Sequence, residues 1–238
     1  MTLPGRFLEI SIHSPDVRTS LDFYRRMGLV EAEPGDIWNH HYAVVSDGRV
    51  ALGLHGYEFA SPALCWVLPG IAAFAPALTA AGIELQFVKT GYEEFNELGY
   101  LDPDGQMLTV LEARTYSPSG EAPKPACGFF SEYRYPVHDL NRSVTFWEQQ
   151  GFVATGWQEE PQPQVSLTSD GIDLSLYIAS RREKPALVFE AADLERAADE
   201  LDSARLDPLA SDDPVRGVPA LTIAAPENTP IVIVQSSI

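Results

Sequence analysis

Residues 7–13 alternate in the way that is typical of a β-strand with two different faces. One face is apolar and consists of Leu8, Ile10 and Ile12. The other face consists of Phe7, Glu9 and Ser11. Because the apolar face is needed to cover the helix that follows, we expect the opposite face to line a cleft.

A helix is predicted directly after this strand. Ser14-Pro15 supplies an N-cap and a first-turn proline, apolar residues follow at helical spacing, and Gly28 ends the helix. Two short strands are expected next, at 42–46 and 50–55. A further strand and helix, and then two strands that flank Asp102-Pro-Asp-Gly105, complete the first half of the chain.

The same pattern recurs later in the chain. Gly28 and Gly151 end equivalent helical segments, and other matched residues show the same separation of 123 positions. Two homologous domains are therefore predicted at 3–115 and 128–238, joined by a linker at 116–127 that is rich in proline and small residues. A strand, a helix and then a few antiparallel strands, repeated in this order, predict an α+β fold.

The order of these motifs resembles the vicinal oxygen chelate superfamily, which includes glyoxalase I, bleomycin-resistance proteins and extradiol dioxygenases. Ser14-Pro-Asp16 and Ser20-Leu-Asp-Phe-Tyr24 are similar to the start of a module in that superfamily, and Tyr100-Leu-Asp-Pro-Asp-Gly105 is similar to a module's end. The resemblance covers nearly the whole chain. It implies four βαβββ modules in two tandem glyoxalase-like domains, whose curved mixed sheets enclose clefts that bind a ligand.

The resemblance also implies where a metal ion would bind, because metal-dependent members take ligands from the first and last strands of their modules. The equivalent positions, from the first to the fourth module, are Glu9 and Gly53, Ala63 and Thr109, Glu132 and Ser175 or Leu176, and Ala186 and Val232. Each cleft then receives one carboxylate, whichever modules pair. One carboxylate does not hold a divalent ion tightly, so we expect neither the usual metal site nor another cofactor.

A rearranged site for a divalent metal is the alternative. His13 extends the strand face of Glu9, and His55 extends the face of Gly53, so that Glu9, His13 and His55 could together hold an ion. Histidines that make ordinary hydrogen bonds at the edge of a cleft are the simpler interpretation.

Residues that are expected to contact a ligand lie on strands that face the clefts or in segments beside them. No catalytic residue is predicted among them. They are Phe7, Glu9, Ser11, His41, His55, Tyr100 and Thr109 in the first half, and Glu132 and Arg134 in the second. Glu132 and Arg134 share a strand face and are close enough for an ion pair.

Composition limits the partners of the chain. The formal net charge is −18, which disfavours binding to nucleic acid and to anionic membrane surfaces. Neither a secretory segment nor a membrane-spanning apolar run is present in the sequence, and two cysteines cannot build a disulfide framework. We expect a cytoplasmic protein, monomeric or homodimeric, whose partner is a small molecule.

Two classes of function remain open. The first is a glyoxalase- or bleomycin-resistance-like protein that binds a small organic molecule in a cleft without the usual metal. The second is a metal-dependent lyase, isomerase or ring-cleaving dioxygenase with a rearranged site. The second rests on the resemblance alone, since function depends on the site and not on the fold.

Overall fold

The computed structural model describes residues 5–34, 41–91, 95–112, 116–117, 122–179 and 183–236. The elements of the first half are β1 (Arg6–His13), α1 (Val17–Arg26), β2 (Val30–Pro34), β3 (Tyr42–Ser46), β4 (Ala51–His55), β5 (Ala63–Val67), α2 (Ile71–Ala80), β6 (Leu85–Lys89), β7 (Glu97–Leu101) and β8 (Met107–Leu111). A short strand, β9 (Tyr116–Ser117), follows them. None of the described helices is long and apolar enough to span a membrane.

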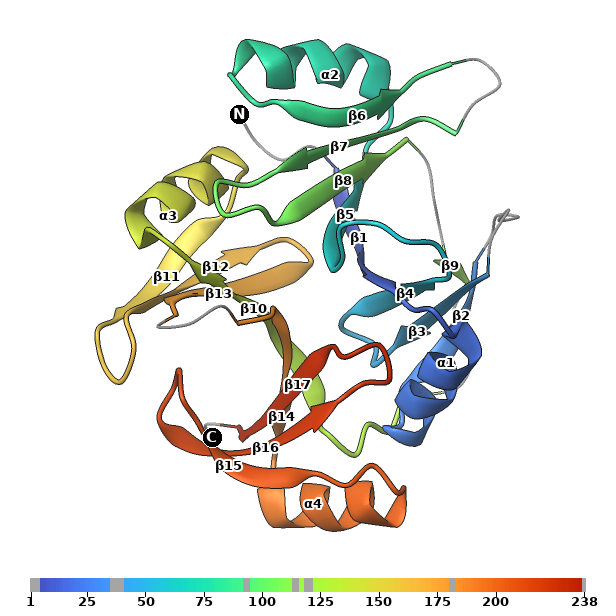
Figure 1. Cartoon of the computed structure of the whole chain (residues 1–238), viewed down its shortest axis with the longest axis vertical. Helices are drawn as coiled ribbons and strands as arrows, with labels where there is room; N and C mark the ends of the chain where they lie inside the picture. Colours follow the sequence, from blue (N-terminus) through green and yellow to red (C-terminus); the bar gives the residue numbers. More distant parts are fainter. Residues whose placement is uncertain are drawn as a thin grey trace.

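The second half repeats this order. Its elements are β10 (Phe129–Val137), α3 (Leu140–Gln149), β11 (Val153–Gln158), β12 (Gln164–Ser169), β13 (Ile172–Ile178), β14 (Ala186–Ala191), α4 (Leu194–Ser203), β15 (Leu209–Asp213), β16 (Val218–Ala224) and β17 (Pro230–Gln235). The α+β fold of four βαβββ modules is therefore confirmed (Figure 1).

Each half folds into one mixed sheet. Within the described residues the strand orders are β6-β7-β8-β5-β1-β4-β3-β2-β9 and β11-β12-β13-β10-β14-β17-β16-β15. The first strands of two consecutive modules pair antiparallel at the centre of each sheet, β1 with β5 and β10 with β14. Modules one and two thus build the first sheet, and modules three and four build the second.

Aspartates begin three of the four described helices. Asp16, Asp139 and Asp193 each accept a hydrogen bond from the backbone N–H three residues further on, which satisfies a donor that the helix leaves open. Asp16 therefore takes the capping position that the sequence pattern assigns to Ser14. The Ser14 hydroxyl instead donates to Ser20, one turn into the helix, at 2.8 Å.

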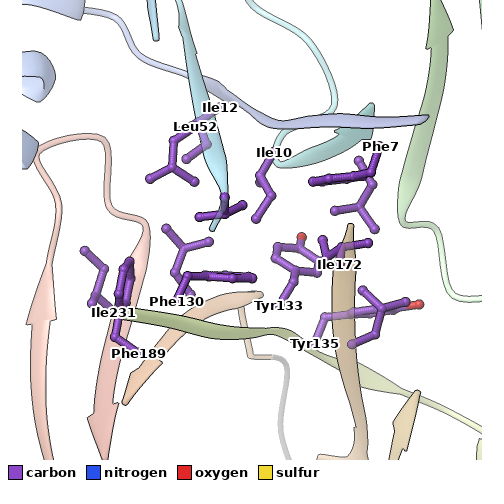
Figure 2. Packing of buried hydrophobic residues seen from close by; sticks show 14 of the residues in the cluster. Phe7, Ile10, Ile12, Leu52, Phe130, Tyr133, Tyr135, Ile172, Phe189 and Ile231 are labelled. Carbon is purple, nitrogen blue, oxygen red and sulfur yellow. The ribbon is translucent and has the colours of Figure 1, made fainter. Parts of the chain in front are cut away.

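The two halves share one hydrophobic core. Side chains of β1 and β4, among them Ile10 and Leu52, point toward Phe130 and Tyr133 of β10 (Figure 2). A single hydrophobic cluster contains residues of both sheets. One face of each sheet is thus packed against the other half.

Polar contacts also link the halves. The turn that ends the second module presents Asp104 to α3, where it accepts a hydrogen bond from Ser143. In the fourth module Glu227 stands 123 positions later and accepts hydrogen bonds from Ser20 and Tyr24 of α1. The module-ending turns therefore hold the first helix of the other half in place.

Candidate functional site

A pocket of about 160 Å³ opens on the face of the first sheet that is turned away from the shared core. Its floor is formed by side chains of β1, β4, β5 and β8, among them Glu9, Ser11, His55, Ala63, Met107 and Thr109. Its walls come from the β4–β5 connection and from the region of β6 and β7, and include Tyr57, Phe59, Phe87, Lys89, Phe95 and Glu97.

Glu9 is the charged group at the floor of the pocket, and its residue is 1% exposed. Ser11 Oγ donates to Oε1 at 2.6 Å, and the Tyr42 hydroxyl donates to Oε2 at 2.7 Å. His55 Nε2 lies 2.9 Å from Oε1. A buried carboxylate needs such partners, because burial without them carries a large free-energy cost. The three contacts therefore fix the carboxylate in one orientation.

Gly53 makes room for this carboxylate. A Cβ atom at Gly53 would overlap the carboxylate of Glu9. Glycine at this position of β4 thus leaves the space that the carboxylate of Glu9 fills. The Glu9 carboxylate is directed toward protein hydrogen-bond donors.

The side chains of the pocket do not fit a divalent metal site. The other positions that the resemblance implies carry Ala63 and Thr109, and neither offers a carboxylate or imidazole. No group of three or more His, Cys, Asp or Glu side chains in the described ranges could hold a metal ion. His13 does not line this pocket. It borders a second cavity between the halves, so Glu9, His13 and His55 do not form the alternative site.

A β-bulge changes which side chains of β1 face the pocket. The register between β1 and β5 shifts between Phe7 and Glu9. As a result Phe7 joins the shared core and packs against Trp66 with ring centroids 5.3 Å apart. Leu8 instead packs with Cys65 and Leu111 on the pocket side. The expectation that Phe7 lines the cleft is thus incorrect for its position, because the extra residue reverses the alternation.

Two other residues that the sequence suggested lie away from the pocket lining. Tyr100 is fully buried, and its hydroxyl donates to Gln150 of the second half at 3.2 Å. His41 is exposed and lies beside Gly56, whose N–H donates to the His41 carbonyl. Of the residues that the sequence suggested, Glu9, Ser11, His55 and Thr109 line the pocket.

The equivalent face of the second half is occupied by an ion-pair network. Arg134 Nη1 donates to both carboxylate oxygens of Asp213, at 2.7 and 2.8 Å, and Arg134 Nη2 lies 3.0 Å from Glu132 Oε1. Arg216 Nη2 lies 2.9 Å from Glu132 Oε2, and Arg216 also pairs with Glu190. The ion pair expected between Glu132 and Arg134 is therefore present, as part of a larger cluster.

Electrostatic attraction holds this network together, although Glu132, Arg134 and Asp213 are buried and Arg216 is half-buried. Burial lowers the pKa of Arg216, but attraction to Glu132 and Glu190 outweighs that effect and raises the pKa overall. The register of β10 with β13 aligns Arg134 with Ser175, so Ser175 is the counterpart of Gly53. Like the first site, this one offers a single strand-borne carboxylate at the implied metal positions, and two guanidinium groups already contact it.

Sequence patterns did not identify the walls of the pocket. Phe87, Phe95, Lys89 and Glu97 come from β6, β7 and their connection, and they reach the site because β7 pairs with β8. In the same manner, Asp213 reaches Arg134 and Arg216 reaches Glu132 from the β15–β16 region. Nothing in the local sequence around these residues marks them as partners, since the contacts depend on the order of strands in each sheet.

No sequence-family model and no curated protein sequence matches the chain. Solved structures do match it over its whole length. A catechol 2,3-dioxygenase superposes with a TM-score of 0.68 at 14% identity, over 100% of this chain and 89% of that one. The 2,3-dioxygenase LapB from Pseudomonas sp. KL28 gives 0.68 at 13% identity, over 100% and 94%.

A third structure is a variant of homoprotocatechuate 2,3-dioxygenase from B. fuscum in complex with HPCA. It gives a TM-score of 0.68 at 16% identity, over 100% of this chain and 73% of that one. At such low identities the similarity concerns the backbone architecture and not the site. The chain therefore shares the tandem βαβββ fold of these dioxygenase structures.

Proposed function

We propose that the first half binds a small, largely apolar organic molecule in the pocket above Glu9, and that no divalent metal holds this ligand. The observation that carries the proposal is the position of the Glu9 carboxylate. It fills the space over Gly53, accepts hydrogen bonds from Ser11 and Tyr42, and lies beneath aromatic walls. A pocket with an apolar lining and a few fixed polar groups is typical of sites for small organic ligands.

The size of the pocket limits the ligand. Its volume is about 160 Å³. Apolar protein cavities of roughly 150 Å³ accept benzene. A single ring with one small substituent therefore matches the pocket, whereas a molecule with several rings would extend through the mouth into solvent.

The walls favour a flat ligand. Tyr57 and Phe59 pack together with ring centroids 5.1 Å apart, and His55 contacts both rings at 5.6 Å. Phe87 and Phe95 line the pocket from the region of β6 and β7. Aromatic rings interact favourably in stacked or edge-to-face geometry, so a planar ligand gains more here than a branched aliphatic one.

Polar groups on the floor can orient the ligand. Thr109 is half-buried on β8 and its side chain lines the pocket, as do those of Ser11 and His55. A ligand that carries one hydrogen-bonding group would place that group toward the floor and its ring between the walls. Metal-dependent chemistry is supported only by the likeness of fold, and the donor set described above does not fit it.

A panel of one-ring aromatic compounds, followed by ligand-observed NMR and isothermal titration, tests the proposal. We expect binding that is unchanged by EDTA. Thr109→Trp should abolish it, because the indole would enter the pocket. Thr168→Trp is the matched control, since Thr168 lines a cavity on the equivalent face of the second half. Binding that EDTA removes, and that one equivalent of a divalent ion restores, would contradict metal-independent binding.

A further inference from the structure

A row of residues crosses the first sheet on the pocket face. Residues that lie directly opposite each other on neighbouring strands point to the same face of a sheet. The row runs through β6, β7, β8, β5 and β1 and consists of Phe87, Gly99, Thr109, Cys65 and Glu9. Four of these residues line the pocket with their side chains. Gly99 has no side chain, so it leaves a gap in the row at β7.

The ring of Phe87 fills the gap at Gly99. A Cβ atom at Gly99 would lie 2.3 Å from Phe87 Cε1 and 2.6 Å from Phe87 Cζ. These two atoms belong to the outer edge of the ring, so the ring leans from β6 across the backbone of β7 toward Thr109. Two carbon atoms that are not bonded to each other pack at about 3.5–4.0 Å. Any side chain at position 99 would therefore displace the ring.

A second contact holds the Phe87 ring. Lys89 is two residues further along the same face of β6, and its ammonium lies 5.8 Å from the ring centre in a cation–π contact. The same ammonium pairs with Glu97, which lies directly opposite Lys89 on β7. Phe87 is half-buried and Gly99 is buried. The ring is thus held over β7 while part of its surface remains open to the pocket.

We propose that the ligand is aromatic and packs its ring against Phe87, and that Gly99 is the positioning residue that holds Phe87 in place for this contact. A ligand whose polar group lies at Thr109 would place its ring beside Phe87, since the two residues flank Gly99 in the row. Contact between two aromatic rings then favours an aromatic ligand over a saturated one of the same size. This inference rests on the proposed function, because it names the ligand class of the same pocket.

Benzyl alcohol and cyclohexylmethanol test the inference, because they have similar sizes and the same hydroxyl group but only one of them is aromatic. In NMR titrations the wild-type protein should bind benzyl alcohol about two- to tenfold more tightly. Phe87→Ala should remove most of this preference, and Gly99→Ala should lower it. Gly156→Ala is the matched control, since a Cβ atom at this strand glycine of the second half meets nothing within 4 Å. The preference should persist in that variant.

A double variant separates the positioning role of Gly99 from general damage to the pocket. In the Phe87→Ala background, Gly99→Ala should leave both affinities unchanged, because no ring remains to be displaced. An equal loss of affinity in both backgrounds would overturn the inference. A preference for benzyl alcohol that survives Phe87→Ala would also overturn it, and this measurement decides the matter if Gly99→Ala does not fold.

The outcomes distinguish this inference from the proposed function. If either contrary result is found while Thr109→Trp abolishes the binding of both alcohols, the proposed function stands and the inference fails. If Thr109→Trp leaves both affinities unchanged, the pocket is not the site and both proposals fail.

Discussion

Arg134 is expected to contribute most strongly to stability among the charged residues of the second half. Its residue is 2% exposed, and its main partner Asp213 is fully buried. Arg134→Met keeps a long apolar side chain but leaves Asp213 and Glu132 without this guanidinium. Removing one partner of a buried ion pair costs about 3–5 kcal/mol, since it leaves a buried charge uncompensated. Arg216 still contacts Glu132, so most of the loss should come from Asp213.

A double-mutant cycle separates the free energy of the Arg134–Asp213 interaction from the effect of each substitution on packing. Asp213→Asn retains an oxygen that can accept from Val215 N, a bond of 3.1 Å in the wild-type chain, but it presents an amide N–H group to Arg134. Each single variant should be destabilised. In the double variant Arg134→Met, Asp213→Asn the free energy of unfolding should fall by less than the sum of the two single decreases, with a coupling free energy of about 2 kcal/mol.

Urea unfolding at neutral pH, followed by tryptophan fluorescence and circular dichroism, measures these free energies. Because the halves share one core, both signals should change in a single transition. Arg25→Met is the control. It breaks an exposed pair with Glu31 and should cost less than about 1 kcal/mol. If the two single effects add to within about 0.5 kcal/mol, the Arg134–Asp213 pair is not the source of the stability.

Two further predictions concern contacts between the halves. Burial raises the pKa of Asp102 in the folded chain, although Tyr135 and two backbone N–H groups donate to it. The carboxyl group of Asp102 therefore binds a proton more tightly in the folded chain than in the unfolded chain, so the wild-type protein should lose stability relative to Asp102→Asn as the pH rises from about 4. Urea unfolding of both proteins across that pH range measures the difference. A gain in the relative stability of the wild type with rising pH would contradict the prediction. Ser143→Ala removes the hydrogen bond to Asp104 and should lower the unfolding free energy by about 1.5–3 kcal/mol in the same assay, while Thr145→Ala, whose bond stays within α3, should cost less.

The fold could be predicted because its signals are local and repeated. Alternation along residues 7–13, a helix that ends at Gly28, and the turn at Asp102-Pro-Asp-Gly105 each reflect the backbone preferences of a few neighbouring residues. The repeat after 123 positions then showed that these elements form equivalent units. Pairing of β1 with β5 within one half was left open by the sequence, because nothing local distinguishes it from pairing across the halves.

The site could be predicted only in part, and the bulge in β1 shows why. Phe7 and Leu8 are both large and apolar, so their order does not reveal which one packs in the core. Only the pairing of Phe7 with Trp66, and of Glu9 with Cys65, fixes the register. The sequence did identify Glu9, Ser11, His55 and Thr109. Glu9 and Ser11 lie after the bulge in β1, and His55 and Thr109 lie on β4 and β8, which the bulge does not affect. The aromatic walls depend on contacts between distant strands.

The two halves have the same backbone fold, but the side chains on their equivalent faces differ. A single position accounts for much of this difference. Ser11 and Arg134 are equivalent, since each lies opposite the alanine that begins the neighbouring strand, Ala63 or Ala186. In the first half the short serine donates to Glu9 and leaves the pocket open. In the second half the long arginine occupies that volume and ties Glu132 to a buried partner. The carboxylate can remain in both halves because each supplies it with hydrogen-bond donors. In the second half those donors fill the site, and in the first they leave space for a ligand to occupy.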